Sequence, residues 1–401
     1  MNYPILEKLY YKNKKEYEEE YLKRFNNIST IKLDIEINKN PAFIIITPEI
    51  LNQIFNILTL NDKLSQLTYT LPQIALDQYI KRCLIEEIVL TNEIEGVIST
   101  RRDIAEILEN TSKIDNHKRL SGLVNKYVKL GKKENLNLQT CQDIREIYND
   151  LVFEEIFAND KNDLPDGIYF RKNSVSVLST FGKEIHEGVM PEEEINKKMT
   201  QSLDILNNEK INILIRIALF HYLFGYIHPF YDGNGRVSRF ISSFLLSKHF
   251  NILTGYRLAY TIKENISKYY NSFKIANEQK NKGDLTPFII NFFDILIKML
   301  ENLYSDLLEK FELIDYYYKI SEKLSNGKSQ NQSVIFVLFQ ETLFGNDGLS
   351  ISKLVKYSQT SEYKVRQVIS DLKELNLIKE IKFGKKLLYS FDLDILRELD
   401  F

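Results

Sequence analysis

Long stretches of this chain carry apolar residues three and four positions apart, with few residues that would interrupt a helix. Glycine occurs 15 times and proline only 8 times in 401 residues. Because this spacing places apolar side chains on one helical face, it predicts a mainly helical protein. Thr47 and Pro48 are typical of a helix start. Further helices are expected over residues 14–23, 72–92, 99–111, 191–224, 235–250, 262–279 and 286–313.

Two segments depart from the helical pattern. Residues 159–191 contain several glycines and prolines and an alternating Ser-Val-Ser-Val run, which predicts a loop with a short β-hairpin. A polar run over residues 325–333 predicts a linker. Beyond it, helices near 333–341, 351–357 and 362–374 followed by a hairpin within 377–391 have the order of a winged helix-turn-helix.

Length and composition narrow the class of protein. A chain of 401 residues predicts two or three domains, and a net charge of −2 gives no overall attraction to nucleic acid or to anionic membrane. The first residues lack a signal-peptide pattern, and no uncharged apolar run is long enough to span a membrane. Cys83 and Cys141 lack metal-ligand spacing. We therefore expect a soluble, cytoplasmic protein without a membrane partner.

The densest group of reactive side chains is HPFYDGNGRVSR, from His228 to Arg239. Glycines at a helix start let the backbone approach an anion, and the free N–H groups there attract it. Arg236 and Arg239 lie three apart, so both forked donors can face one phosphate group. Asp232 could hold Mg²⁺ beside phosphates, and His228 could accept a proton. The set predicts a site that handles phosphate.

This pattern resembles the signature of the Fic (Fido) domain, most of whose members transfer AMP from ATP to a hydroxyl side chain of a protein. The resemblance implies a helical Fic core, with ATP and Mg²⁺ as cofactors. It implies His228 as catalytic base and Asp232 as metal ligand. The implied phosphate contacts are Asp232, Gly233, Asn234, Gly235, Arg236 and Arg239.

A second motif, Thr-Asn-Glu-Ile-Glu-Gly over residues 91–96, would by itself be an acidic, solvated helix face. Beside the Fic motif it resembles the family's inhibitory signature, with Thr91, Glu95 and Gly96 on the matching positions. A carboxylate against Arg239 would occupy the group that the γ-phosphate of ATP needs. We therefore expect Glu95 to be inhibitory, on a helix that belongs to the N-terminal region of the chain.

Two further segments resemble parts of the Fic nucleotide site. Residues 166–180 resemble the flap, a hairpin over the active site, which implies nucleotide contacts by Val177, Leu178, Ser179 and Thr180. One helix after the motif, Tyr269, Tyr270 and Asn277 have the spacing of the family's adenine-side helix. A pair of tyrosines in a helix also commonly packs in a core, so at least one is expected to be structural.

The expected organisation is an N-terminal helical region (1–115), a Fic core (116–310) and a winged helix (325–401). The winged helix has basic residues, but acidic residues after 391 bring its net charge to about zero. DNA binding and protein contact both remain open for it. The predicted function is AMP transfer to an unknown target protein and to the chain itself, with a homodimer as a further expectation. The alternatives are AMP removal at the same site, or a DNA-binding regulator that senses nucleotide.

Overall fold

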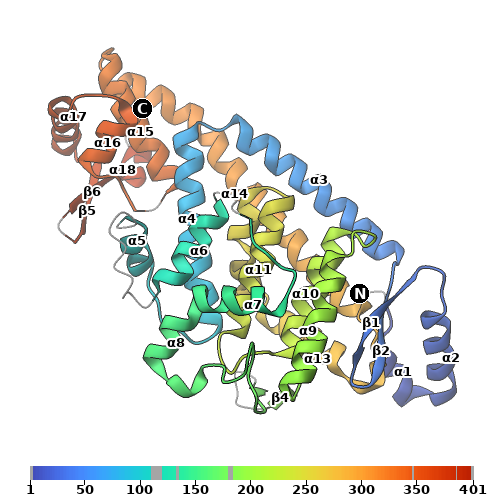
Figure 1. Ribbon diagram of the computed structural model, residues 1–401. Helices are drawn as coiled ribbons and strands as arrows, with labels where there is room; N and C mark the ends of the chain where they lie inside the picture. The colour runs from blue at the N-terminus through green and yellow to red at the C-terminus, as the bar shows by residue number, and fades with distance from the viewer. Residues whose placement is uncertain are drawn as a thin grey trace. The chain divides into compact units, whose positions relative to one another are not determined.

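The computed structural model describes residues 3–109, 120–131, 135–178, 184–345, 347–384 and 386–398. Helices dominate these ranges, which confirms the predicted class, and the strands form separate two-stranded antiparallel sheets (Figure 1). Backbone contacts divide the chain into two compact units, 1–61 with 85–301 and 62–84 with 302–401. Helices α3 (Pro48–Thr70), α4 (Gln73–Ile94) and α14 (Thr286–Leu324) contribute residues to both. The boundaries predicted from the sequence remain predictions. None of the described helices is long and apolar enough to cross a membrane.

The first unit begins with two short helices and a hairpin (Figure 1). Helix α1 covers Leu6–Lys12 and α2 covers Lys14–Phe25, and the strands are β1 (Thr30–Ile37) and β2 (Asn40–Ile45). The sequence analysis missed this hairpin, although β1 has the alternating pattern of a strand. Its side chains at 33, 35 and 37 are buried and those at 32, 34 and 36 are exposed.

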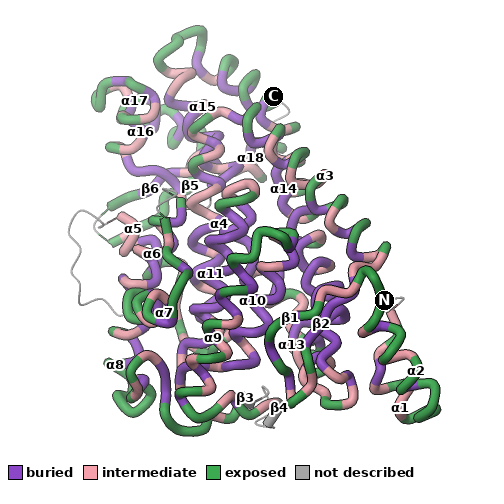
Figure 2. The backbone as a smooth tube through the Cα atoms, turned by 45° about the vertical axis from the view of Figure 1, so that its right-hand side comes forward, coloured by how far each residue is buried: buried purple, intermediate pink, exposed green. Residues whose placement is uncertain are grey.

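Two buried helices form the centre of this unit. Helices α10 (Ile213–Ile227) and α11 (Asn234–His249) are buried along most of their length (Figure 2). Helix α10 is apolar on nearly all sides, as expected for a helix inside a core. The two are separated only by residues 228–233, so the loop of the phosphate motif is held at both ends by the core.

The other elements of this unit surround that pair. They are α5 (Arg101–Glu109), α6 (Ser121–Gly131), α7 (Cys141–Tyr148), α8 (Glu154–Asn159), β3 (Ser176–Leu178), β4 (Glu184–Glu187), α9 (Glu192–Asn207), α12 (Leu258–Glu264) and α13 (Ile266–Asn277). The predicted stretch 191–224 is two helices, because Asn212 caps α10 by accepting a hydrogen bond from the Leu214 amide at 2.9 Å. The predicted stretch 262–279 also divides, at Asn265.

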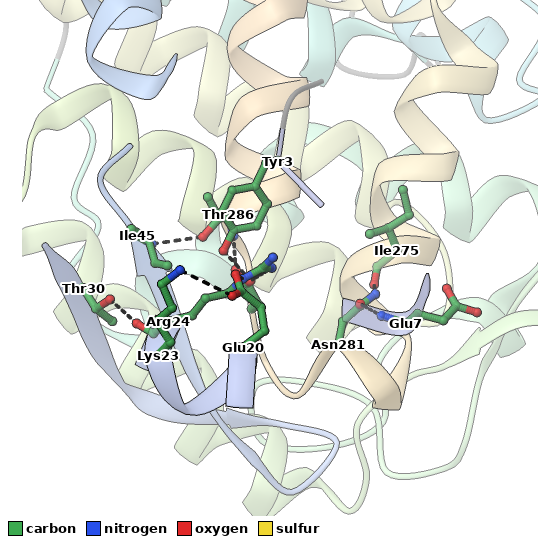
Figure 3. Close-up of polar contacts among 11 residues, drawn as sticks. Tyr3, Glu7, Glu20, Lys23, Arg24, Thr30, Ile45, Ile275, Asn281 and Thr286 are labelled. Atoms are coloured by element: carbon green, nitrogen blue, oxygen red, sulfur yellow. Dashed lines mark hydrogen bonds and ion pairs between the residues drawn. The ribbon is translucent and has the colours of Figure 1, made fainter. Parts of the chain in front are cut away.

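The N-terminal segment is joined to the start of α14 by a buried polar network around Asp284 (Figure 3). Arg24 donates to Asp284 at 3.2 Å, and the Tyr3 hydroxyl donates to the same carboxylate oxygen at 2.7 Å. The guanidinium of Arg24 also lies 4.3 Å from the Tyr3 ring centroid. The amide of Thr286 donates to the other oxygen of Asp284 at 3.0 Å. One buried carboxylate therefore links the N-terminus, the end of α2 and the start of α14.

We expect Tyr3→Phe to lower the free energy of unfolding by about 1.5–3 kcal/mol, the usual loss for a hydrogen bond to a charged group. The ring stays in place, so the change isolates the hydroxyl. Chemical denaturation measures it, with Tyr69→Phe as the control, since Tyr69 is 92 % exposed. Equal stability of both variants and the parent chain would show that the Asp284 network does not depend on Tyr3.

The second unit contains the elements predicted for its C-terminal part. These are α15 (Ser329–Phe344), α16 (Ile351–Ser358), α17 (Glu362–Glu374), β5 (Ile378–Phe383) and β6 (Lys386–Phe391). A short helix that was not predicted, α18 (Leu393–Glu398), follows them. The helix–helix–helix–hairpin order is the predicted one. The linker expected at 325–333 is shorter than predicted: residues 325–328 connect α14 to α15, whereas the polar residues from Ser329 on form the first turn of α15. Rings of Phe339 and Phe391 stack 3.9 Å apart in the core of this unit.

Candidate active site

The loop at residues 228–233 has a left-handed backbone at each end, which fixes its shape. His228 ends α10 with a left-handed backbone (φ 52°), and its amide donates to the Phe224 carbonyl at 2.9 Å. Gly233 precedes α11 with φ 84°, and a Cβ there would lie 2.9 Å from a methyl group of Val152. Only glycine suits this second position without strain or a clash.

Aromatic packing and one amide anchor the loop from below. Phe230 is fully buried, and the centroid of its ring lies 4.0 Å from that of Tyr148 in a stacked pair. The side chain of Asn234 accepts from the Phe230 amide at 2.9 Å and donates to the Phe230 carbonyl at 2.7 Å. Asn234 was expected to contact phosphate, but its side chain closes the loop, so an anion here would meet its main chain.

His228 is held by a buried arginine that the sequence analysis did not single out. Arg171 donates from Nε to the His228 carbonyl at 2.9 Å and from Nη2 to the Val189 carbonyl at 2.8 Å. It therefore joins Val189, which follows β4, to the loop at residues 228–233. Burial lowers the pKa of His228, and the positive charge of Arg171 lowers it further. The imidazole is therefore neutral at pH 7, the form that can accept a proton.

Arg236 pairs with two carboxylates. Its Nη1 pairs with Glu155 of α8, and its Nη2 lies 3.2 Å from Asp232 Oδ2. Both Arg236 and Glu155 are almost fully buried. Glu155 lies 81 positions before its partner, so no local spacing could have revealed it. Phosphate binding by Arg236 remains a prediction, and the structure adds that this arginine orients Asp232.

Asp232 has the surroundings expected of a ligand for a phosphate-bound cation. Its side chain is 41 % exposed, and one oxygen accepts a hydrogen bond from the Gly233 amide. Among the described residues, no group of three or more His, Cys, Asp or Glu side chains could hold a metal alone. Mg²⁺ commonly takes one or two carboxylates and completes its shell with phosphate oxygens and water. The residues present therefore fit an Mg²⁺ ion that arrives with a nucleotide.

Arg239 is buried and is bound by the predicted inhibitory motif. Its Nη2 lies 2.8 Å from Glu95 Oε1. The same guanidinium donates from Nε to the Thr91 hydroxyl at 2.8 Å and from Nη2 to the Thr91 carbonyl at 2.9 Å. Two segments more than 140 residues apart thus meet at one side chain.

The Glu95 carboxylate also lies over the first turn of α11. A Cβ built on Gly235 would come within 2.0 Å of Glu95 Oε1 and 2.8 Å of Arg239 Nη1. The start of a helix and an arginine together form the usual setting for a phosphate group. The Glu95 carboxylate therefore lies where a phosphate group would bind.

Two buried titratable groups, His221 and Glu87, lie close enough to Arg239 to feel its charge. His221 is within 2.8 Å of both Ser242 Oγ and the Tyr269 hydroxyl, and burial lowers its pKa to about 3. It is therefore neutral and positions the Ser242 and Tyr269 hydroxyls. Glu87 of α4 is fully buried, and burial raises its pKa to about 7.

The raised pKa of Glu87 makes stability depend on pH. Its carboxyl is protonated more readily in the folded than in the unfolded chain. Its contribution to the free energy of unfolding is therefore complete below about pH 4.5 and is lost as the pH rises through about 7. We expect the Tm of Glu87→Gln minus the Tm of the parent chain to be larger at pH 8 than at pH 5. Thermal unfolding at both values measures this, with Glu93→Gln as a control for losing one exposed charge. If this difference in Tm is the same at both pH values, ionisation of the buried Glu87 carboxyl does not destabilise the fold.

The flap residues and the adenine-side residues lie on different elements of this unit. Val177 and Leu178 belong to β3, while Ser179 and Thr180 lie outside the described residues. Tyr269 is buried with its hydroxyl against His221, so it is the structural member of the pair, and Tyr270 is more exposed. Asn277 accepts a hydrogen bond from the Tyr222 hydroxyl at 2.8 Å. Nucleotide contacts by these residues remain predictions.

Comparisons with known proteins agree with this geometry. Residues 138–246 match the Fic/DOC family. "Protein adenylyltransferase Fic" of Drosophila sechellia is 29 % identical over 269 residues, 64 % of this chain and 50 % of that protein. The protein of the same name from Drosophila willistoni is 31 % identical over 283 residues, 67 % and 52 % of the two chains. This chain therefore spans about half the length of these curated relatives.

One solved structure supports the fold over most of the chain. A Fic family protein from Desulfovibrio desulfuricans G20 superposes with a TM-score of 0.52 at 18 % identity. The match covers 86 % of this chain and 96 % of that protein.

Proposed function

Because residues 138–246 form a Fic domain, we propose that this protein transfers AMP from ATP to a hydroxyl side chain of a target protein and of itself. The observation that carries the proposal is the ion pair between Glu95 and Arg239 at the start of α11. A carboxylate placed in an anion site supports both a phosphate substrate and inhibition by the chain itself.

The reaction is an in-line displacement at the α-phosphorus of ATP. The hydroxyl oxygen of the target forms the new bond to phosphorus, the bond to the pyrophosphate oxygen breaks, and His228 takes the hydroxyl proton. Mg²⁺ held by Asp232 would neutralise phosphate charge when bound. The protein contributes mainly position and charge, through the start of α11 and Arg239.

The inhibited state follows from the position of Glu95. With Glu95 on Arg239, the γ-phosphate lacks its cation, and ATP can bind only in a pose unsuited to attack. Release of α4 from Arg239 would restore the site. The basal activity of the parent chain is therefore low.

Incorporation of radiolabel from α-labelled ATP tests this proposal in the full chain. The parent chain, Glu95→Gly and His228→Ala are compared for labelling of the protein itself. The proposal requires strong labelling in Glu95→Gly alone. No labelling in Glu95→Gly, together with release of AMP from a modified protein by the parent chain, would favour AMP removal at the same site.

DNA binding by the C-terminal part is less supported. Three of its basic residues are paired with carboxylates of the same part. Arg366 pairs with Glu362 at 2.7 Å, Lys379 pairs with Asp392 at 3.0 Å, and Lys373 pairs with Glu380. Cations paired within the chain are less available to phosphates of DNA. We therefore favour protein contact for this part.

A further inference from the structure

The acidic residues of α4 are mostly engaged with the segment at residues 257–263. Glu86 pairs with Arg257, and Glu93 lies 3.1 Å from Lys263 at the surface. Between them, Glu87 is fully buried. Acidic residues on a helix are ordinarily solvated, whereas Glu86 and Glu87 here bind residues 257–260.

The Glu87 carboxylate accepts hydrogen bonds from backbone amides at the start of α12. Its two oxygens lie 2.9 and 2.8 Å from the Ala259 amide, and Oε2 lies 3.4 Å from the Tyr260 amide. The hydroxyl of Ser243 in α11 donates to Oε1 at 3.4 Å. One carboxylate of α4 therefore contacts both α12 and α11.

Glu87 and Thr91 are four residues apart on one face of α4, and Glu95 follows at the same spacing just after the helix. Glu87 binds α12, while Thr91 and Glu95 bind Arg239. Glu95 itself lies beyond the last helical residue, Ile94, and Gly96 follows with φ 73°. Terminal turns open easily, so the position of Glu95 depends on contacts further up the helix.

From this arrangement we infer that Glu87 is the positioning residue for inhibition: it fixes α4 on α12 and thereby holds Glu95 on Arg239. The inference rests on the proposed function and adds how its inhibition is maintained. Glu87 does not touch the nucleotide site directly. Its effect on AMP transfer therefore passes through Glu95.

A double-mutant cycle tests this dependence. Loss of hydrogen bonds to buried amides corresponds to about a 10-fold shift in a coupled equilibrium. We expect Glu87→Ala to raise self-labelling about 10-fold when Glu95 is present and to leave it unchanged in the Glu95→Gly background. Glu87→Gln keeps an acceptor for the amides and should remain within about 2-fold of the parent chain. An equal rise in both backgrounds, or no rise in either, would overturn the inference.

Two further variants make the result specific. Glu93→Gln removes an exposed pair on the same helix and should leave labelling near the parent level, because exposed pairs contribute little. If Glu87→Ala does not fold, Glu87→Leu fills the space and still removes the acceptors. A rise with Glu93→Gln as large as with Glu87→Ala would mean that any weakening of α4 suffices, which contradicts a specific role for Glu87.

Hydrogen exchange separates failure of this inference from failure of the proposed function. We expect faster exchange of the amides at residues 91–97 in Glu87→Ala than in the parent chain and in Glu93→Gln. If Glu95→Gly shows no labelling, the proposed function fails, while faster exchange still supports the role of Glu87 in positioning α4. Unchanged exchange at 91–97 would overturn that role whether or not the protein labels itself.

Discussion

Replacing His228 by alanine in the Glu95→Gly background is expected to lower AMP incorporation by about 10²–10⁴-fold, the usual contribution of a general base. The imidazole is neutral because burial and Arg171 lower its pKa, so it is ready to take the hydroxyl proton. Arg171 and the left-handed backbone at residue 228 hold it in place. Its loss should reduce kcat and leave nucleotide binding nearly unchanged.

The measurement is the initial rate of label transfer from α-labelled ATP, with His249→Ala as the control because His249 is an exposed histidine at the end of α11. Thermal unfolding verifies that both variants are folded. Transfer by His228→Ala at the rate of its Glu95→Gly parent would rule out His228 as the base.

Replacing Glu95 by glycine is expected to raise self-labelling by about 10- to 100-fold, since the hydrogen bond from the buried Arg239 guanidinium to Glu95 must otherwise be broken for each productive event. The change frees Arg239 and the first turn of α11 together. The result should be a higher kcat at saturating ATP, because the competing carboxylate is gone.

Glu93→Gly is the matched control for this second prediction. It places glycine in the same last turn of α4, where it weakens the helix by a similar amount, but Glu93 pairs with Lys263 at the surface and not with Arg239. Labelling by Glu93→Gly should remain below that of Glu95→Gly. If both rise equally, a looser helix and not the Glu95 carboxylate explains the effect.

Local patterns predicted those parts of the molecule that depend on neighbours in sequence. The twelve residues from His228 to Arg239 form one loop and one helix start, so their order alone placed them together. The start of α3 at Pro48 was likewise predicted from its capping residues. The contact of Glu95 with Arg239 joins distant segments, and only the family resemblance could suggest it.

The missed residues are buried charges whose partners are far away in sequence. Glu155, Arg171 and Glu87 bind groups on other elements, and each would be read from sequence as an ordinary polar residue on a helix or in a loop. The β1–β2 hairpin is a different kind of miss, because its alternating pattern was visible. Alternation of buried and exposed side chains over residues 33–37 is the sequence signal that marks this strand within a mostly helical chain.

Nucleotide affinity tests most directly the claim that Glu95 and the γ-phosphate compete for Arg239. Calorimetric titration with Mg²⁺–ATP and Mg²⁺–ADP compares the parent chain with Glu95→Gly, in the His228→Ala background so that no transfer occurs. The account predicts that Glu95→Gly tightens binding of ATP more than binding of ADP, because only ATP brings the group that Arg239 is free to receive. Equal changes for both nucleotides, or no change for ATP, would contradict it.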